Sequence, residues 1–250
     1  MASVNGSTVT FSHYTNYATR NWVKRKQGSI NYISSPNRDF SNSDAQEQEK
    51  FTQFLAGFFE VKQIPITYYS CVNAEELFRV RGFDFNMQMF LHKTGGQAGF
   101  NNDLYSGNNR DIYNHEVVHL YLNKAVKGKI NSLLNEGLAT YMGGSNEMEY
   151  SQHRANLLSY IIENPDFDFA QYLNAYDTFY INQDSTSVPY TVGALICELA
   201  YKECGKDLLL QMIGEPDIDK AFALLGLNKA NLNQRLRALL KHQVYLIPGT

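Results

Sequence analysis

The stretch NHEVVHLYLNKAV, residues 114–126, decides both the predicted fold and the candidate chemistry of this 250-residue chain. Its apolar residues recur at helical spacing, yet His115, Glu116 and His119 stand in its middle. Burying imidazoles and a carboxylate is costly unless a partner compensates for the lost hydration. The stretch therefore predicts a helix with a polar site on it, and a metal ion is the obvious partner.

The two histidines are four residues apart, so on a helix they lie one turn from each other on the same face. Both imidazoles can then reach one ion. Asn108 is expected to cap this helix, and Asp111 is expected to place a carboxylate in its first turn, where the helix dipole favours negative charge.

Two histidines do not complete a catalytic zinc site, which usually has three protein ligands and an open position. The next predicted helix, residues 130–142, contains NEGLATY and supplies Glu136 as the third ligand. A turn around Gly128 can fold this helix back against the first, and Gly137 is expected to permit close approach of these two helices. Glu116 points about 100° around the helix from His115, which suits a general base acting on a metal-activated water rather than a ligand.

HEVVH followed by NEGLATY resembles the gluzincin metallopeptidases, the group that includes thermolysin-like and aminopeptidase-N-like enzymes. The resemblance implies a zinc ion held by His115, His119 and Glu136, with Glu116 as base and proton shuttle in peptide-bond hydrolysis. It also implies a zincin-like fold, with an α/β lobe and a helical lobe on either side of the zinc-site cleft. The motifs cover residues 108–144, and the looser likeness in the order of elements covers 45–240.

Two departures from these enzymes concern specificity and the surroundings of the metal. Thermolysin-like enzymes have an aspartate four residues after the third ligand, where this chain has Thr140, so the groups that orient the ligands must differ. GGQAGF, residues 95–100, does not match the substrate-amine motif of the aminopeptidase-N-like group. Specificity for a free N-terminus is therefore not expected.

The resemblance also implies a donor for the oxyanion from the helical lobe, and Tyr190 is the candidate because it opens a helix in the corresponding part of the chain. His153 and Tyr180 compete for this role. Since the chain has 17 tyrosines, Tyr190 could equally be a packing or surface residue.

The rest of the chain predicts an α+β fold with an N-terminal α/β lobe, residues 1–127, containing a mixed sheet. A mainly helical lobe, 128–250, follows, and the two are expected to pack as one catalytic unit. The stretch AGFNNDLYSG, 98–107, is either an edge strand lining the cleft or an ordinary hairpin. Strands are predicted at 7–18, 29–34, 65–71 and 87–93, and helices at 43–62 (capped by Ser43), 73–80, 149–164, 189–204, 218–226 and 232–243.

Composition excludes several classes of protein. The net charge is −3, and the only basic cluster, Lys24-Arg25-Lys26, is expected in a solvated turn, so nucleic acid is not an expected partner. No apolar run is long enough for a membrane helix. Three cysteines do not form a disulfide framework. The expected partner is a peptide or protein substrate, while oligomeric state and compartment stay open, with a secreted or periplasmic location favoured if a leader has been removed.

Three functions from different classes compete at this point. The first is a zinc-dependent peptidase, and the second is a zinc-stabilised, non-catalytic peptide-binding module. The third is a metal-free α/β interaction protein in which the motif is a coincidence. Glu116 speaks against the second, because a structural site prefers four protein ligands and has no use for a base.

Overall fold

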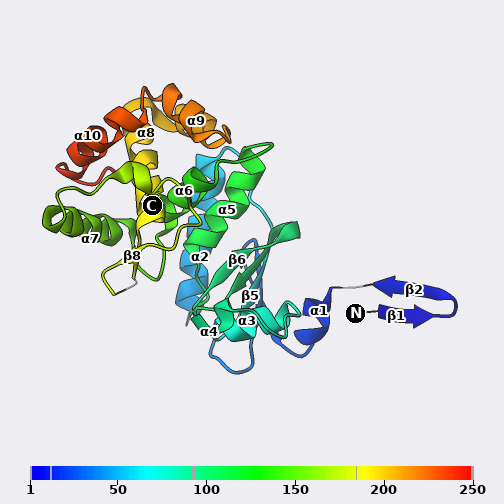
Figure 1. Ribbon diagram of the computed structural model, residues 1–250. Helices are drawn as coiled ribbons and strands as arrows, with labels where there is room; N and C mark the ends of the chain where they lie inside the picture. Colours follow the sequence, from blue (N-terminus) through cyan, green and yellow to red (C-terminus); the bar gives the residue numbers. More distant parts are fainter. Residues whose placement is uncertain (1, 12, 92–93, 184, 249–250) are drawn as a thin grey trace. The chain divides into compact units, whose positions relative to one another are not determined.

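A mixed β-sheet is followed along the chain by a set of helices (Figure 1), which confirms the predicted α+β class. The structure is a computed structural model that describes residues 2–11, 13–91, 94–183 and 185–248. The chain divides into two compact units. The first comprises Met1–Ala56 and Lys62–Val117, and the second comprises Gly57–Val61 and Val118–Thr250. Helix α5, Asn114–Ala125, continues from the first unit into the second.

The sheet of the first unit has the strand order β3-β4-β5-β7-β6. Its three inner strands are parallel, and the outer strands β3 and β6 pair antiparallel with their neighbours. Strand β4 alternates buried and solvent-facing side chains, with Ile30 and Tyr32 in the core. The strands are β3 Val23–Gln27, β4 Ile30–Ser34, β5 Ile66–Ser70, β6 Gly96–Ala98 and β7 Asp103–Ser106.

The N-terminal region differs from the predicted strand at 7–18. A separate hairpin joins β1, Ala2–Asn5, to β2, Thr8–Phe11, and a short helix α1, Tyr14–Ala18, comes next. The basic cluster Lys24-Arg25-Lys26 is exposed as expected, but it lies in the edge strand β3 rather than in a turn. Charged side chains on an edge strand hinder pairing with other chains, which accounts for a strand of this composition.

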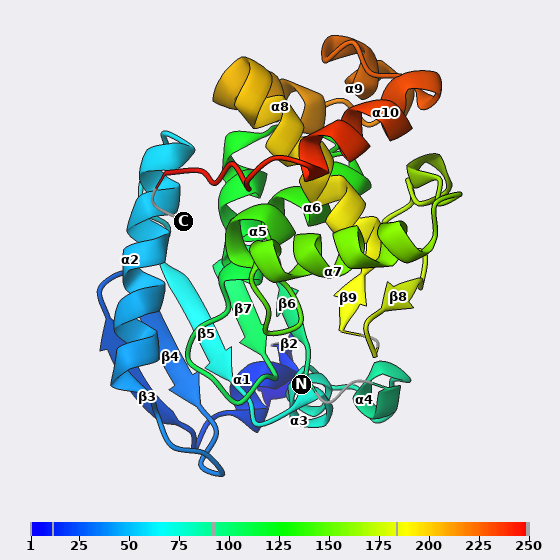
Figure 2. The same cartoon turned by 90° about the vertical axis from the view of Figure 1, so that its left-hand side faces the viewer.

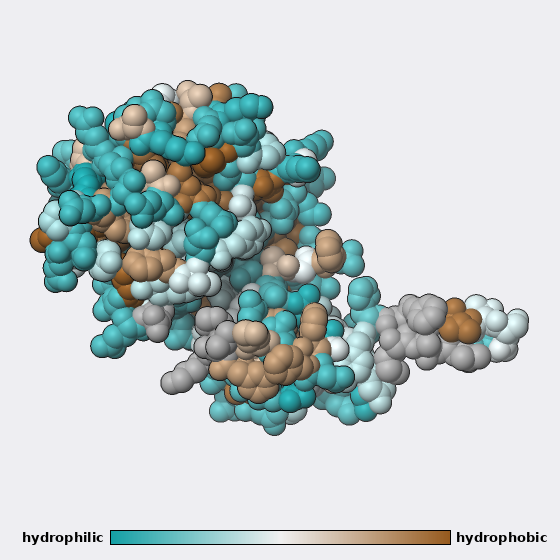
Figure 3. Space-filling model, viewed as in Figure 1, coloured by the Kyte–Doolittle hydropathy of each residue, from teal (hydrophilic) through white to brown (hydrophobic). Residues whose placement is uncertain are grey.

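The predicted strand at 87–93 is wrong over its described part, because Gln88–Leu91 forms the short helix α4; His92 and Lys93 lie outside the described residues. Hydrophobic side chains gather over α3, Ala74–Val80, and α4 (Figure 3). Across residues 83–90, Met89 is the one large apolar side chain that is buried. This segment is therefore held by a single buried residue, whereas a strand on the sheet would bury every second side chain. The exposed ones are Phe83, Phe85, Met87 and Phe90.

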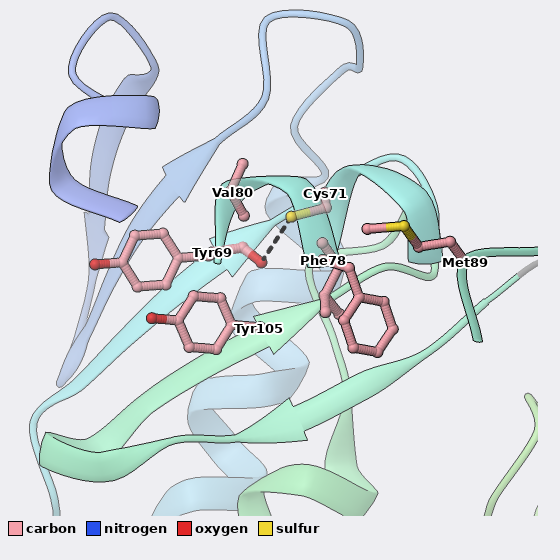
Figure 4. Close-up of a cluster of buried hydrophobic side chains, with 7 residues drawn as sticks. Tyr69, Cys71, Phe78, Val80, Met89 and Tyr105 are labelled. Carbon is pink, nitrogen blue, oxygen red and sulfur yellow. Dashed lines mark hydrogen bonds between the residues drawn. The ribbon is translucent and has the colours of Figure 1, made fainter. Parts of the chain in front are cut away.

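Met89 packs into a cluster of buried side chains from α3, β5 and β7 (Figure 4). The rings of Tyr69 and Tyr105 stack with their centroids 4.7 Å apart. Cys71 lies in this cluster, and all three cysteines of the chain are free.

Helix α2, Asn42–Phe58, runs alongside β4 (Figure 2). It begins one residue before the predicted cap Ser43, and the Ser41 hydroxyl instead accepts the hydrogen bond from the Asp44 amide. Inside α2, the buried Glu49 carboxylate accepts hydrogen bonds from the Ser29 amide and hydroxyl. These bonds fix the helix against the β3–β4 turn.

The segment that leads into α5 is fixed by Asp111, which is fully buried and is not part of the helix. Its two carboxylate oxygens accept hydrogen bonds from the Arg38 guanidinium at 2.6 and 2.9 Å, and Oδ1 also accepts one from Ser70. Asn108 does not cap α5, because the helix begins six residues later and the Asn108 amide donates to the Ile112 carbonyl. The predicted helix is present, but Asn108 and Asp111 lie outside it and hold the segment that precedes it.

The second unit is mainly helical, as predicted. Within the described ranges 2–11, 13–91, 94–183 and 185–248, no helix is long and apolar enough to cross a membrane. Gly205, predicted as a helix end, instead marks a kink with a φ of 77° inside α8, after which helical turns resume. The elements are α6 Ser132–Gly143, α7 Tyr150–Glu163, β8 Tyr180–Ile181, β9 Thr186–Ser187, α8 Val188–Ile213, α9 Ile218–Leu224 and α10 Lys229–Leu240.

Helices α6 and α8 cross with their backbones in contact. A Cβ atom added at Gly137 would lie 2.3 Å from the carbonyl carbon of Gly193, and one added at Gly193 would lie 2.5 Å from the carbonyl oxygen of Leu133. Only glycine fits at these two positions. Gly137 therefore does permit a close approach, but to α8 and not to α5, the helix expected from the sequence; this contact sets the position of α6 against α8.

Replacing Gly193 with alanine should destabilise the chain by about 1–3 kcal/mol, because the new methyl group overlaps backbone atoms that cannot move aside. Urea unfolding measures this change. Gly57 is the matched control, since it is helical and has no atom within 4 Å of an added Cβ. Gly57→Ala should stabilise by up to about 1 kcal/mol. Equal effects of the two changes would contradict this account of the crossing.

Candidate metal centre

His115 and His119 lie in the first half of α5, one turn apart. Both side chains are buried, with 6% and 8% of their residue surface exposed. Their neighbours Val117, Val118 and Leu122 are wholly buried, so the helix is apolar around the two rings. A pair of imidazoles in such surroundings needs polar partners.

Glu136 lies in the first half of α6, the next helix along the chain. Asn131 caps α6 by accepting a hydrogen bond from the Leu134 amide, and the Asn131 backbone amide donates to the Ile213 carbonyl. Glu136 Oε2 lies 3.5 Å from His119 Nε2. One ligand atom from each of His115, His119 and Glu136 lies within 4.8 Å of the other two, so these three side chains could together hold a metal ion.

The opposite edge of the His119 ring is held by Asn135, with 2.9 Å between His119 Nδ1 and Asn135 Oδ1. An amide oxygen accepts hydrogen bonds and cannot donate them, so Nδ1 carries the proton in this arrangement. If the ring is neutral, His119 Nε2 then has its lone pair on the side of Glu136. This tautomer is the one a metal-binding imidazole requires.

The residues present fit a metal ion on two counts. First, an unprotonated His119 Nε2 and a Glu136 carboxylate oxygen are both electron donors, and their separation of 3.5 Å would let both coordinate one cation; a proton on Nε2 would instead make the same contact an ion pair. Second, two ligand atoms about 2.0–2.2 Å from a tetrahedral zinc ion are roughly 3.4 Å apart, close to the observed separation. The histidine and carboxylate donors also match the ligand preference of zinc.

Glu116 is not part of this group, as its position after His115 predicts. Glu116 is only 9% exposed, and its Oε2 accepts a hydrogen bond from the Ala98 amide at 2.7 Å. Ala98 lies in β6, the outermost described strand of the sheet. The stretch 98–107 contains the last residue of β6, the turn and β7, so it makes up most of a hairpin; the strand within it, β7, is an inner strand, and the edge strand β6 lies mainly before it.

The three candidates for an oxyanion donor differ in their surroundings. His153 is fully buried: its Nε2 lies 2.8 Å from the Ser145 carbonyl oxygen, and its Nδ1 lies 3.2 Å from the Thr186 hydroxyl, so both nitrogens are engaged inside the protein. Tyr180 is half-buried in β8. Tyr190 is half-buried in the first turn of α8 and three residues before Gly193, where α8 touches α6 beside Glu136.

Asn135 is the residue of this centre that the sequence did not reveal. The buried Thr140 hydroxyl, four residues after Glu136, has no hydrogen-bond partner among the described residues, so it does not hold either histidine ring. The available signal was the polar Asn135 directly before Glu136 in an otherwise apolar helix. The angle of about 100° between successive helical residues lets this pair contact both edges of one ring.

Neither the comparison with protein-family models nor the comparison with curated proteins finds a match to this chain. A function can therefore be inferred only from the geometry of the site.

Replacing Asn135 with alanine should weaken zinc binding by about 10–100-fold, because His119 loses the partner that fixes its tautomer and its orientation. Competition with a chromophoric chelator measures the affinity. Asn123→Ala is the matched control, since Asn123 is an exposed asparagine on α5. If Asn135→Ala binds zinc as tightly as Asn123→Ala does, Asn135 does not orient His119.

Proposed function

We propose that this protein is a zinc-dependent peptidase that hydrolyses peptide bonds. The observation that carries the proposal is the convergence of His115, His119 and Glu136, with Glu116 directly after the first ligand on the same helix. A group of three protein ligands leaves one tetrahedral position open, as catalytic zinc sites do, whereas structural sites are closed by a fourth protein ligand.

The proposed ligands are both imidazoles and the Glu136 carboxylate. When bound there, a zinc ion supplies Lewis-acid chemistry: it polarises a carbonyl group and lowers the pKa of a coordinated water. The protein contributes the geometry. Asn135 keeps His119 in the required tautomer, and the contact of Gly137 with Gly193 keeps α6 in place.

Glu116 is the proposed general base. Its carboxylate takes a proton from the attacking water and delivers that proton to the nitrogen of the cleaved peptide bond. Two features support this role. The Glu116 side chain leaves α5 about 100° around the helix axis from that of His115, so it can reach a water molecule beside the metal without being a ligand. Its surroundings are also largely closed to solvent, which strengthens electrostatic interactions at the carboxylate.

The Tyr190 hydroxyl is the proposed donor to the developing oxyanion of the substrate. Support comes from its place on α8, one turn before the glycine that touches α6 next to the third ligand. The alternative donor His153 is weakened as a candidate, because both of its ring nitrogens already have partners.

Zinc content and peptide hydrolysis should separate in Glu116→Gln. The purified wild-type chain should hold about one zinc ion per chain and cleave a mixed peptide library, whereas Glu116→Gln should keep the zinc and lose at least about 100-fold in turnover, because the amide cannot accept the proton. Elemental analysis and mass spectrometry of the library measure the two properties. His115→Ala should lose both.

Two results would contradict the proposal in different ways. Zinc in the wild type and in Glu116→Gln without cleavage by either would favour a zinc-stabilised module that only binds peptides. Absence of metal from the wild-type chain after chelator-free purification and zinc addition would make the motif a coincidence.

Removing the Tyr190 hydroxyl should lower kcat with little change in KM, because the hydroxyl interacts with charge that develops only in the transition state. The expected loss in Tyr190→Phe is about 10- to 1,000-fold. Tyr176→Phe is the matched control, since Tyr176 is 81% exposed and belongs to no part of the proposed site. Wild-type kcat in Tyr190→Phe would remove this residue from the mechanism.

A further inference from the structure

We propose that the edge strand β6 is the device that positions the Glu116 carboxylate, through the Ala98 amide and the absence of a side chain at Gly96. The inference rests on the proposed function, because it assigns positioning residues to the base of that reaction. It concerns a contact within the first unit of the chain.

The hydrogen-bonding pattern of the β6–β7 hairpin leaves the Ala98 amide free for Glu116. Gln97 is opposite Tyr105, and the flanking bonds run from Gly107 to the Gly95 carbonyl and from Gly99 to the Asp103 carbonyl, each at 2.7 Å. In an antiparallel pair, alternate residues direct their amide groups away from the partner strand. Ala98 is one of these, and its N–H group donates to Glu116 Oε2 instead of to β7.

Gly96 allows the start of α5 and the preceding residue Tyr113 to lie directly against β6. An ideal Cβ at this position would come within 2.2 Å of the Tyr113 ring and within 2.7 Å of Glu116 Cγ. The Glu116 side chain therefore occupies the space that any other residue at position 96 would fill. Strand β6 thus binds the Glu116 carboxylate through the Ala98 amide and, at Gly96, leaves space for the Glu116 Cγ.

Both sides of this contact are anchored. Strand β6 is paired with β7, and the segment before α5 is held by the Tyr113 amide, which donates to Gln48 Oε1 of α2 at 2.6 Å. A glutamate side chain has several rotatable bonds, and a charge-assisted hydrogen bond at one oxygen selects one of its conformers. The other oxygen, Oε1, is then the atom that can exchange a proton with the reacting groups.

Hydrogen exchange of the full-length, metal-free chain tests the contact without any use of activity. In Glu116→Ala, the Ala98 amide should exchange at least about tenfold faster, because its only assigned acceptor has been removed. The Gly99 and Gly107 amides are internal controls, since their carbonyl acceptors lie in the hairpin, and their exchange should not change. Glu116→Gln, which keeps an acceptor oxygen, should restore most of the protection.

Kinetics of two glycine variants test the consequence for the reaction. Gly96→Ala should lower kcat by about 10- to 100-fold, with zinc content retained and KM little changed, because the methyl group displaces the base and not the ligands. Gly95→Ala is the matched control: its Cβ would meet only the Ala74 Cβ, at an ordinary 3.6 Å, and it should keep wild-type kcat. Ala98→Pro, which deletes the N–H group, should lower kcat as Gly96→Ala does.

Each result supports or overturns a distinct statement. Faster exchange at Ala98 alone, together with the fall in kcat, supports the positioning role. Unchanged exchange at Ala98 in Glu116→Ala overturns it, even if the wild-type chain cleaves peptides, and so does equal kcat in Gly96→Ala and Gly95→Ala. A wild-type chain that cleaves nothing overturns the proposed function, while the exchange result still decides the contact.

Discussion

The approach of His119 Nε2 to a Glu136 oxygen is the constraint on which the rest of the site depends. Asn135 accepts the hydrogen bond from Nδ1 on the other edge, so in a neutral His119 ring two electron donors, Nε2 and the Glu136 carboxylate, face each other. A metal ion between the donors, or a proton on Nε2, makes this approach favourable, and His115 adds a third possible ligand atom to the same group. The geometry of the folded chain therefore fits a metal ion at the place that the sequence motif indicates.

The surrounding structure places these donors by contacts that no single helix could provide. Gly137 and Gly193 bring the backbones of α6 and α8 together, and the Asn131 cap fixes where α6 begins. On the other side of the motif, the buried pair of Asp111 and Arg38 fixes the segment before α5. Removing one partner of a buried ion pair leaves a charge without compensation. The entry into α5 is therefore well determined.

The sequence could predict the parts of this protein that depend on local spacing. Histidines four apart place both rings on one face of α5. The glycine after Glu136 predicted a close helix contact, although its partner is α8 and not the expected α5. Features that depend on distant partners could not be predicted: Asp111 looked like a first-turn carboxylate, but Arg38 and Ser70 hold it outside the helix. The segment 87–93 was predicted as a strand, yet Gln88–Leu91 is a short helix, and among residues 87–90 only Met89 is anchored in the core. The hydrogen bond from the Ala98 amide to Glu116 could not be predicted from the residue type at position 98, because any residue but proline supplies a backbone N–H group.

The central claim is that His115, His119 and Glu136 bind one metal ion through these particular atoms. Anomalous diffraction at the zinc edge, from crystals grown with zinc, tests it most directly. The account predicts one peak per chain at about 2.0–2.2 Å from a ring nitrogen of each histidine, Nε2 in the case of His119, and from an oxygen of Glu136. No peak between these side chains, or a peak that Glu136 does not contact, would contradict it.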